Sequence, residues 1–412
     1  MLGVQVSRDP FRYRSQTLSA AKYTIASYRR SCSNQSDPGR LLHRTFSIHI
    51  LQKDDEDEPD IEDFLVAKKD NVFDETDEIT ESDDEILKIK HPRFGIANYE
   101  TIISNNMLAQ NDPFSWEPLQ SQVAGHGIDT EGKASTVPGV LITSEGQILK
   151  PVQESRGVQR GLTEVAFYSH IMQSKDLKDL EIKKWVPKFF GIEQFESDAD
   201  GILTVSNFLV LEDITAGFEL PVVMDIKIGK IVYGPDASAE KKARANNHSW
   251  PTRDPLGFKV SGLLAHSLKP EDEDQLNQDG NVYSKKSFGQ KLTPETVSKV
   301  PETFYNFEFD EKIQTVNDMF VKKLKSILKV FEDQSQYHIY GSSLLFTYDA
   351  NAVRKFRKGK LSIHEFEPFL NIKLIDFANV YESDGEKDEN FTRGLRNVIS
   401  IFENFSSKGK QR

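Results

Sequence analysis

The stretch Pro221-Val222-Val223-Met224-Asp225-Ile226-Lys227-Ile228-Gly229 places an acid and an amine two positions apart in an otherwise apolar run. Successive side chains of a β-strand point to opposite faces, so we expect Asp225 and Lys227 to share one face. A carboxylate beside an ammonium group at the end of a strand suits a site for a phosphorylated ligand. The alternative is an ordinary surface ion pair, which contributes little to stability.

The composition of the whole chain limits the classes of protein to consider. Its 412 residues, of which 37% are hydrophobic, allow two or three domains or one large two-lobed domain. We expect no membrane span, because no apolar run approaches the length of a bilayer. Cys32 is the only cysteine, which excludes an intrachain disulfide and a cysteine-based zinc site. The net charge of -12 argues against direct nucleic-acid binding, and we expect a monomer.

The first 110 residues differ in composition from the rest, and we expect them to form a disordered extension that is first basic and then acidic. Residues 1–50 are rich in Arg and Ser, which is typical of a mitochondrial transit peptide, of a disordered tail, or of a start codon assigned too far upstream. Residues 54–85 are strongly acidic. Such a segment buries too little apolar surface to offset the entropy lost on ordering.

Regular patterns begin near residue 122, and we assign 111–412 to one α+β domain with a small lobe at about 122–220. A hairpin is expected at 140–150, with its turn at Glu145-Gly146 and its second strand ending in Lys150. The spacing of Leu162, Val165, Ala166, Tyr168 and Met172 predicts a helix that also carries Glu164. An apolar strand at 208–211 then ends in Glu212-Asp213.

The larger lobe is expected to cover about 221–412. Apolar spacing over 313–331 predicts a long amphipathic helix, and the last pattern, over 391–405, predicts a terminal helix packed on the core. Strands are expected at 338–348 and 372–377. Between them, the basic run 354–360 is interpreted as a solvated loop, with a nuclear-import patch as the alternative.

Phosphoryl transfer from a nucleotide needs cations for the phosphates, a carboxylate for Mg²⁺ and backbone groups for the base. Lys150 could supply the first, Asp376 the second, and Glu212-Asp213-Ile214 the third. Each has another interpretation: a surface lysine, a helix cap or buried ion pair, and a turn. The sequence contains no phosphate-binding P-loop, which excludes the P-loop class of nucleotide-binding proteins. It also contains no Gly-x-Gly-x-x-Gly loop and no His-Arg-Asp motif, which excludes ordinary protein kinases.

Three motifs occur in an order that resembles the inositol polyphosphate kinase family. They are Pro221-x-x-x-Asp225-x-Lys227-x-Gly229, Ser342-Ser343-Leu344-Leu345 and Ile375-Asp376-Phe377-Ala378. The likeness extends from Gln122 to the terminal helix and covers none of residues 1–110. Within the family, residues 224–229 and 236–241 are most similar to the multikinase branch. The resemblance implies a two-lobed fold similar to protein kinases and ATP-grasp proteins, with ATP between the lobes.

The resemblance also implies how the cofactors ATP and Mg²⁺ would be held. Lys150 would contact the phosphates, and backbone atoms of Glu212 and Ile214 would bind adenine. Asp225 would accept hydrogen bonds from the ribose hydroxyls. Asp376 would coordinate Mg²⁺, which bridges the transferring phosphate.

For the inositol polyphosphate substrate, the resemblance implies a cationic pocket. Lys227 would face both the substrate and the γ-phosphate and stabilise charge as the bond breaks. Lys241 and Arg244 lie three apart on a helix expected after Ala237, so they would project to one side; the alternative is a solvated helix face. Arg156 would cap the same pocket. Ser342-Ser343 would support the residues that bind the metal and the phosphates, without contacting these ligands directly.

Two positions depart from the family pattern. Asn379 stands where members commonly have His, and an amide can hydrogen-bond a phosphate but carries no charge. Leu263-Leu264 stand where the multikinases usually place an Arg, and Lys259 is a candidate to compensate for its absence.

The expected activity is ATP- and Mg²⁺-dependent phosphorylation of inositol trisphosphate and tetrakisphosphate. One alternative is an inositol hexakisphosphate kinase that makes pyrophosphates. Another is a catalytically weak scaffold that binds partners through its acidic segment. The expected location is the cytoplasm and nucleus, with mitochondria as the alternative suggested by the Arg-rich and Ser-rich N-terminus.

Overall fold

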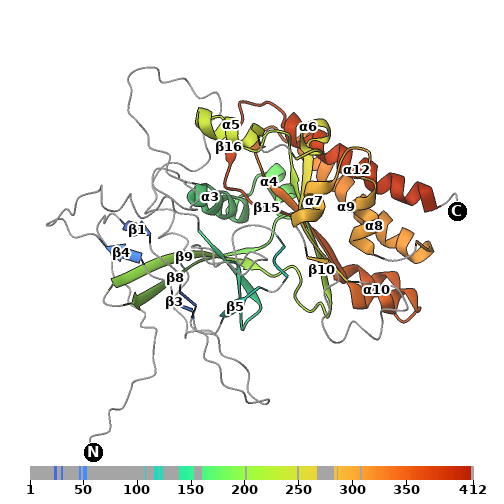
Figure 1. Ribbon diagram of the computed structural model, residues 1–412, viewed down its shortest axis with the longest axis horizontal. Helices are drawn as coiled ribbons and strands as arrows, with labels where there is room; N and C mark the ends of the chain where they lie inside the picture. The colour runs from blue at the N-terminus through green and yellow to red at the C-terminus, as the bar shows by residue number, and fades with distance from the viewer. Residues whose placement is uncertain are drawn as a thin grey trace, which may run out of the picture.

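Two antiparallel five-stranded sheets form the two lobes of the computed structural model (Figure 1). The α+β class and the two-lobed organisation expected from the sequence are therefore confirmed. The structure describes residues 139–152, 160–199, 202–247, 250–266, 286–306 and 309–409, with shorter pieces at 23–25, 29–30, 46–47, 50–52, 107, 116–119, 121–123 and 283–284. Within these residues, no helix is both long enough and apolar enough to cross a membrane.

The small-lobe sheet has the strand order β5-β6-β7-β9-β8. The expected hairpin is confirmed, and its second strand places Lys150 beside Leu209 of the next strand. Its elements are β5 (Trp116–Pro118), β6 (Leu141–Thr143), β7 (Gln147–Pro151), α3 (Arg160–Gln173), α4 (Leu177–Lys183), β8 (Phe189–Ala199) and β9 (Ile202–Glu212). Helix α3 is the helix expected from the apolar spacing.

A short connection, residues 213–220, joins β9 to the large lobe. Asp213 accepts hydrogen bonds from the amide and hydroxyl of Thr215, which makes the first part a closed turn. The buried carboxylate of Asp349 accepts the amides of Glu219 and Leu220, at 2.9 and 3.0 Å. The second part of the connection is thereby fixed to the large lobe.

The large-lobe sheet has the order β12-β11-β10-β14-β15, which places the motif strands next to one another. Lys227 of β10 lies opposite Lys259 of β11 and Ser343 of β14, and Ser343 in turn lies opposite Ile375 of β15. The three sequence motifs therefore meet at one end of this sheet. The strands are β10 (Pro221–Ile228), β11 (Phe258–Ala265), β12 (Tyr283–Ser284), β14 (Ser343–Asp349) and β15 (Leu370–Ile375).

Helices pack around this sheet, and α9 and α12 lie side by side near the C-terminus (Figure 1). Their apolar faces meet an aromatic core, in which Phe346 stacks on Phe402 and meets Phe320. The helices are α5 (Ala239–Asn247), α6 (Arg253–Leu256), α7 (Lys286–Lys291), α8 (Lys299–Tyr305), α9 (Glu311–Asp333), α10 (Ala350–Arg357), α11 (Ile363–Phe366), the 3-10 helix η3 (Glu367–Phe369) and α12 (Glu389–Gly409).

Small two-stranded ladders complete the described structure. In the large lobe, β13 (Tyr337–Ile339) pairs with β16 (Val380–Glu382). Near the N-terminus, β1 (Tyr23–Ile25) pairs with β4 (Ile50–Gln52), and β2 (Arg29–Arg30) pairs with β3 (Phe46–Ser47). Apart from these strands and Met107, the extension expected at 1–110 lies outside the described residues.

Two expectations for the large lobe are wrong in detail. The strand expected at 338–348 is two strands, because the chain turns at Gly341, where φ is 66° and a Cβ would lie 2.8 Å from the Val232 carbonyl oxygen. The basic run 354–360 is not a loop from its start. Its first four residues end helix α10, in which Val353 and Phe356 are buried and Asp349 caps the N-terminus.

Candidate active site

Two carboxylates from different parts of the chain meet at Lys150. Its Nζ lies 2.7 Å from Glu164 Oε1 and 2.7 Å from Asp376 Oδ1. Glu164 Oε1 also accepts the backbone amide of Phe377 at 3.1 Å. The cluster thus ties the hairpin strand, helix α3 and the end of β15 together.

Lys227 approaches Asp376 from the other side. Its Nζ lies 3.6 Å from Asp376 Oδ2 and donates to the Gly341 carbonyl at 2.6 Å. Asp376 follows β15 directly and has φ of 67°, a left-handed backbone that is uncommon for residues other than glycine. Such strain costs of the order of 1 kcal/mol and often marks functional sites.

The two lysines set the charge of Asp376. Desolvation would raise the pKa of this carboxyl, but Lys150 and Lys227 outweigh that effect and hold the pKa well below its usual range. Desolvation would likewise lower the pKa of Lys150, but the carboxylates of Asp376 and Glu164 raise it above its ordinary value. Lys150 and Asp376 therefore stay charged at neutral pH.

Asp225 is the fifth ionisable group of the site, and only 4% of its surface is exposed. Burial and the negative charge of Asp376 raise the pKa of Asp225 to about 6, although Lys227 opposes the shift. Its Oδ1 is buried and has no hydrogen-bond partner among the described residues. An unsatisfied buried carboxylate oxygen of this kind calls for a ligand, since leaving it unpaired is costly.

The donor set of the site fits a divalent ion that is bound mainly by phosphates. The described residues contain no group of three or more His, Cys, Asp or Glu side chains able to hold a metal alone. Mg²⁺ is usually held by one or two carboxylates together with waters and phosphate oxygens. Asp376, about one third exposed, and the unsatisfied oxygen of Asp225 provide hard oxygen ligands of that kind.

The segment expected to bind adenine already uses some of its polar groups. The amide of Glu212 donates to the Lys188 carbonyl at 2.9 Å, and the Ile214 carbonyl accepts the Asn371 side chain at 3.2 Å. The Glu212 side chain accepts the Lys188 amide. The adenine-binding role of Glu212 and Ile214 stays a prediction.

The structure places only part of the expected substrate pocket. Lys241 is half-buried on α5, and this helix is confirmed. Arg156 and the side chain of Arg244 lie outside the described residues, so their roles stay predictions. Asn379 is half-buried, with its Oδ1 unsatisfied within the described part of the chain.

Lys259 lies beside the charged cluster, whereas the nearby leucines do not reach it. Leu263 and Leu264 are buried, with 1% and 5% of their surfaces exposed. Lys259 lies opposite Lys227 across the strand ladder, and its Nζ sits 4.3 Å from the centre of the Trp250 ring. Desolvation and the charges of Lys227 and Arg253 lower the pKa of Lys259 to about 8.

Glu164 belongs to the site, although sequence analysis placed it on a helix without assigning it a role. Its side chain is 4% exposed and pairs with Lys150, an arrangement similar to the Lys–Glu ion pair that aligns the phosphate-binding lysine of protein kinases. The available signal was its position, because it is an acid on a helix stretch that is otherwise apolar or small, and buried acids are almost always paired.

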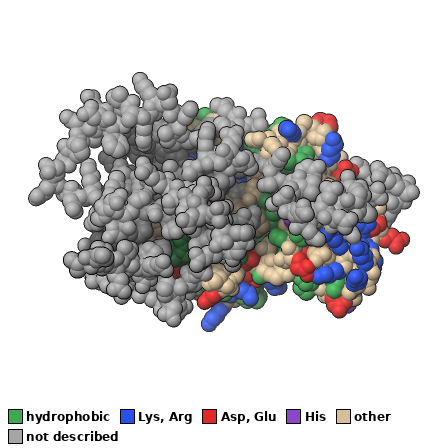
Figure 2. Space-filling view, turned by 60° about the horizontal axis from the view of Figure 1, so that its bottom comes forward, with side chains coloured by type: hydrophobic (Ala, Val, Ile, Leu, Met, Phe, Trp, Pro, Cys, Tyr) green, Lys and Arg blue, Asp and Glu red, His purple; other side chains and the backbone are tan. Residues whose placement is uncertain are grey.

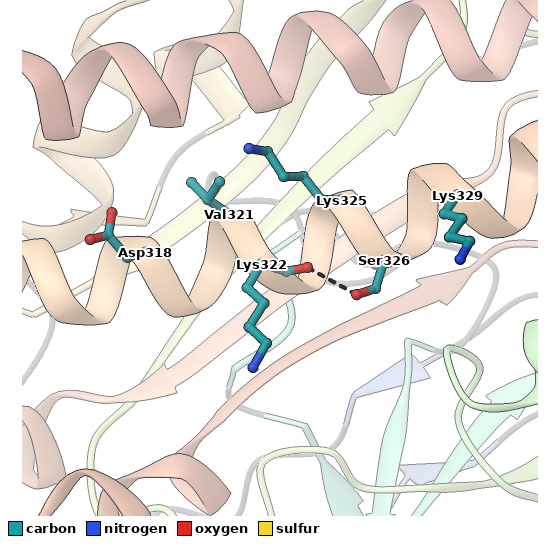
Figure 3. A pocket seen from close by; sticks show the side chains of 6 residues that line it. All are labelled: Asp318, Val321, Lys322, Lys325, Ser326 and Lys329. Atoms are coloured by element: carbon teal, nitrogen blue, oxygen red, sulfur yellow. Dashed lines mark hydrogen bonds between the residues drawn. The ribbon is translucent and has the colours of Figure 1, made fainter.

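A hollow elsewhere on the surface shares no residue with this cluster. It measures about 480 Å³ and is lined by one face of α9, from which Lys322 and Lys329 point to one side and Lys325 points toward the neighbouring helix (Figure 3). Figure 2 shows basic side chains, with acidic ones among them, over this helical end of the molecule. Lys325 pairs with Glu403 of α12 at 2.6 Å. We interpret this hollow as solvated helix surface.

Comparison with known proteins agrees with the geometry. A family model described as inositol polyphosphate kinase matches residues 208–403. The rat inositol polyphosphate multikinase is 33% identical over 238 residues, which cover 57% of this chain and 54% of that protein. The chain thus spans about half the length of this relative. The multikinase beta of Arabidopsis thaliana is 30% identical over 293 residues, which cover 68% of this chain and 91% of that protein.

A solved structure of Ipk2 from S. cerevisiae, in complex with ADP and Mn²⁺, has a TM-score of 0.49 and 24% identity over 63% of this chain and 98% of that one. A TM-score below 0.5 does not by itself establish a common fold, so membership is decided by the sequence matches. The chain belongs to the inositol polyphosphate kinase family.

Proposed function

We propose that this chain is an ATP- and Mg²⁺-dependent inositol polyphosphate kinase of the multikinase type. In this proposal it transfers the γ-phosphoryl group of ATP to hydroxyls of inositol trisphosphate and tetrakisphosphate. The observation that carries the proposal is the convergence of Lys150 and Lys227 on Asp376, with the unsatisfied carboxylate oxygen of Asp225 beside them.

The residues of the cluster divide the work in this proposal. Asp376 would hold the divalent ion, whose positive charge neutralises the phosphates when it is bound. Glu164 would keep Lys150 aligned for the nucleotide phosphates. Lys227, held by the Gly341 carbonyl, would face the transferring phosphoryl group and stabilise the charge that shifts to the leaving oxygen. Because this transition state is loose, positioning and charge supply most of the catalysis.

The direct test is product formation by the purified full chain with ATP, Mg²⁺ and a panel of inositol tris-, tetrakis- and hexakisphosphates. We expect the tris- and tetrakisphosphates to be consumed, with products resolved by isomer-separating chromatography. Consumption of the hexakisphosphate alone would replace the proposal with the pyrophosphate-forming alternative. If none of the compounds is phosphorylated, the proposal is wrong.

The roles of the N-terminal residues and the cellular location are further parts of the proposal. We propose that residues 1–110 are dispensable for turnover, that the protein is a monomer, and that it resides in the cytoplasm and nucleus. A variant that lacks residues 1–110 should keep its turnover, whereas a scaffold acting through the acidic segment would lose its partner. Light scattering reports the mass in solution, and a fluorescent fusion of residues 1–50 that enters mitochondria would contradict the location.

A further inference from the structure

The ribbon formed by β13 and β16 begins close to Asp376 and carries two buried tyrosines. Val380, the first residue of β16, lies four positions after Asp376, and the Tyr340 amide donates to the Asn379 carbonyl at 3.0 Å. Tyr337 is 5% exposed and Tyr381 is fully buried. The ribbon is therefore attached to the segment that presents the metal-binding carboxylate.

The strand register shows that the two tyrosines face opposite sides of the ribbon. Tyr381 lies opposite His338, whereas Tyr337 lies opposite Glu382. Residues directly opposite each other share a face, and neighbours along a strand alternate. Tyr337 and Tyr381 therefore point in opposite directions from one rigid support.

Tyr337 reaches the helices of the small lobe. Its hydroxyl donates to Asp179 Oδ1 of α4 at 2.9 Å and lies 3.1 Å from His170 Nε2 near the end of α3. Its ring meets Phe167 of α3 edge-on, at 5.3 Å between centroids. Helix α3 also carries Glu164, so this face of the ribbon holds the helix that aligns Lys150.

Tyr381 reaches the segment that leads into α5. Its hydroxyl donates to Asp236 Oδ1, three residues before the helix that carries Lys241. The backbone at Gly234 approaches so closely that a Cβ there would lie 1.9 Å from the tyrosine hydroxyl oxygen. This face of the ribbon holds the helix expected to bind the inositol phosphate.

We propose that Tyr337 and Tyr381 are positioning residues with separate targets, the first for the nucleotide side and the second for the substrate side of the site. This inference rests on the proposed function. The ribbon then couples both sides to Asp376, because helix α3, the segment that leads into α5 and the segment that carries Asp376 all contact the same pair of strands. If the two tyrosines served packing alone, their replacement would lower folding stability without changing the affinity for one ligand more than for the other.

The test uses Tyr337→Phe and Tyr381→Phe, each of which removes a single hydroxyl. Equilibrium dissociation constants are measured by calorimetry for a non-hydrolysable ATP analogue with Mg²⁺ and for inositol tetrakisphosphate, and KM is measured for both substrates. A hydrogen bond contributes about 1 kcal/mol, so we expect Tyr337→Phe to weaken nucleotide binding about fivefold and inositol phosphate binding less than about twofold. Tyr381→Phe should give the reverse pattern.

Tyr348→Phe is the matched control. The Tyr348 hydroxyl is also buried, but it donates to the carbonyls of Phe304 and Tyr305 in the aromatic core. This variant should lower the melting temperature and leave both dissociation constants unchanged. Gly234→Ala, which pushes on Tyr381 without removing a polar group, should reproduce the pattern of Tyr381→Phe.

Equal shifts of both ligands in both variants, or no shift in either, would overturn the positioning roles while leaving the kinase activity in place. If the wild-type chain phosphorylates no inositol phosphate, the proposed function fails instead. Nucleotide binding still decides the first half of the inference in that case, because only Tyr337→Phe should weaken it.

Discussion

Lys150 and Lys259 lie on opposite flanks of the same charged cluster, and their surroundings shift their pKa values in opposite directions. Lys150 contacts two carboxylates at 2.7 Å, which raise the pKa of its amine. Lys259 faces Lys227 and lies over the Trp250 ring, and burial with neighbouring cations lowers its pKa to about 8. We call the side of Lys150 the nucleotide flank and the side of Lys259 the substrate flank, after the ligands proposed for them. The positive charge of Lys150 is balanced by carboxylates of the protein, whereas the positive charge of Lys259 would be stabilised by an anionic ligand.

Removal of Asp376 should have the largest effect, because this carboxylate serves both flanks. Asp376→Ala would leave Lys150 and Lys227 without their shared partner and remove the proposed metal ligand. We expect product formation to fall about a thousandfold. The measurement is turnover beside a thermal melt, with Asp310→Asn as the control, since Asp310 caps α9 away from the site. Activity within about tenfold of the wild type would remove Asp376 from the mechanism.

The nucleotide flank is tested next by Lys150→Met. This change removes the cation between Glu164 and Asp376 and leaves Lys227 beside Asp376 alone, so the nucleotide phosphates would meet more negative charge. We expect kcat/KM for ATP to fall about a hundredfold, and Lys150→Arg to recover part of the loss. A measured loss confined to the inositol phosphate KM would contradict the assignment of the two flanks.

The substrate flank predicts a pH dependence. Because its pKa is lowered to about 8, Lys259 loses its charge as the pH rises through that value, and a polyanionic substrate favours the charged form. The KM for inositol phosphate should therefore rise above pH 8, by about tenfold at most over two pH units, while the KM for ATP stays nearly constant. Lys259→Arg should flatten the profile, since arginine stays protonated. An unchanged profile in this variant would show that another group titrates.

The smallest effect is expected at the hollow on α9. Lys329→Gln removes one exposed cation of this hollow. The hollow shares no residue with the charged cluster, and salt screens the interaction between separated charges that are exposed to water. Both KM values should change by less than about twofold at physiological ionic strength. A larger change in the inositol phosphate KM would indicate that the inositol phosphate binds at α9 rather than at the charged cluster.

The sequence predicted the parts of the site that lie in local patterns. Asp225 and Lys227 lie in the apolar strand β10, where strand periodicity places both side chains on one face, and Asp376 directly follows the apolar strand β15. The pairing of Lys150 with Asp376 spans 226 positions, and the sequence analysis did not predict it. Helical spacing identified α3 but could not show that Glu164 turns toward Lys150.

Other features were beyond local reasoning or were weighed wrongly. The basic run at 354–360 was interpreted by its charge, although Ala352, Val353 and Phe356 have helical spacing and Asp349 is a good N-terminal cap. The contacts of Tyr337 and Tyr381 depend on how two short strands sit between helices from different parts of the chain. No sequence pattern reports that arrangement.

The connection between the lobes has a mechanical consequence. Its first part is a closed turn in which Asp213 accepts from Thr215 and the Phe218 amide donates to the Thr215 carbonyl. Its last part is fastened by Asp349 through the amides of Glu219 and Leu220. The Ile214 carbonyl inside the turn also accepts the Asn371 side chain of β15, so the whole connection is fastened to the large lobe. Any opening or closing of the molecule would therefore bend the chain before Asp213, and the connection would move together with the large lobe.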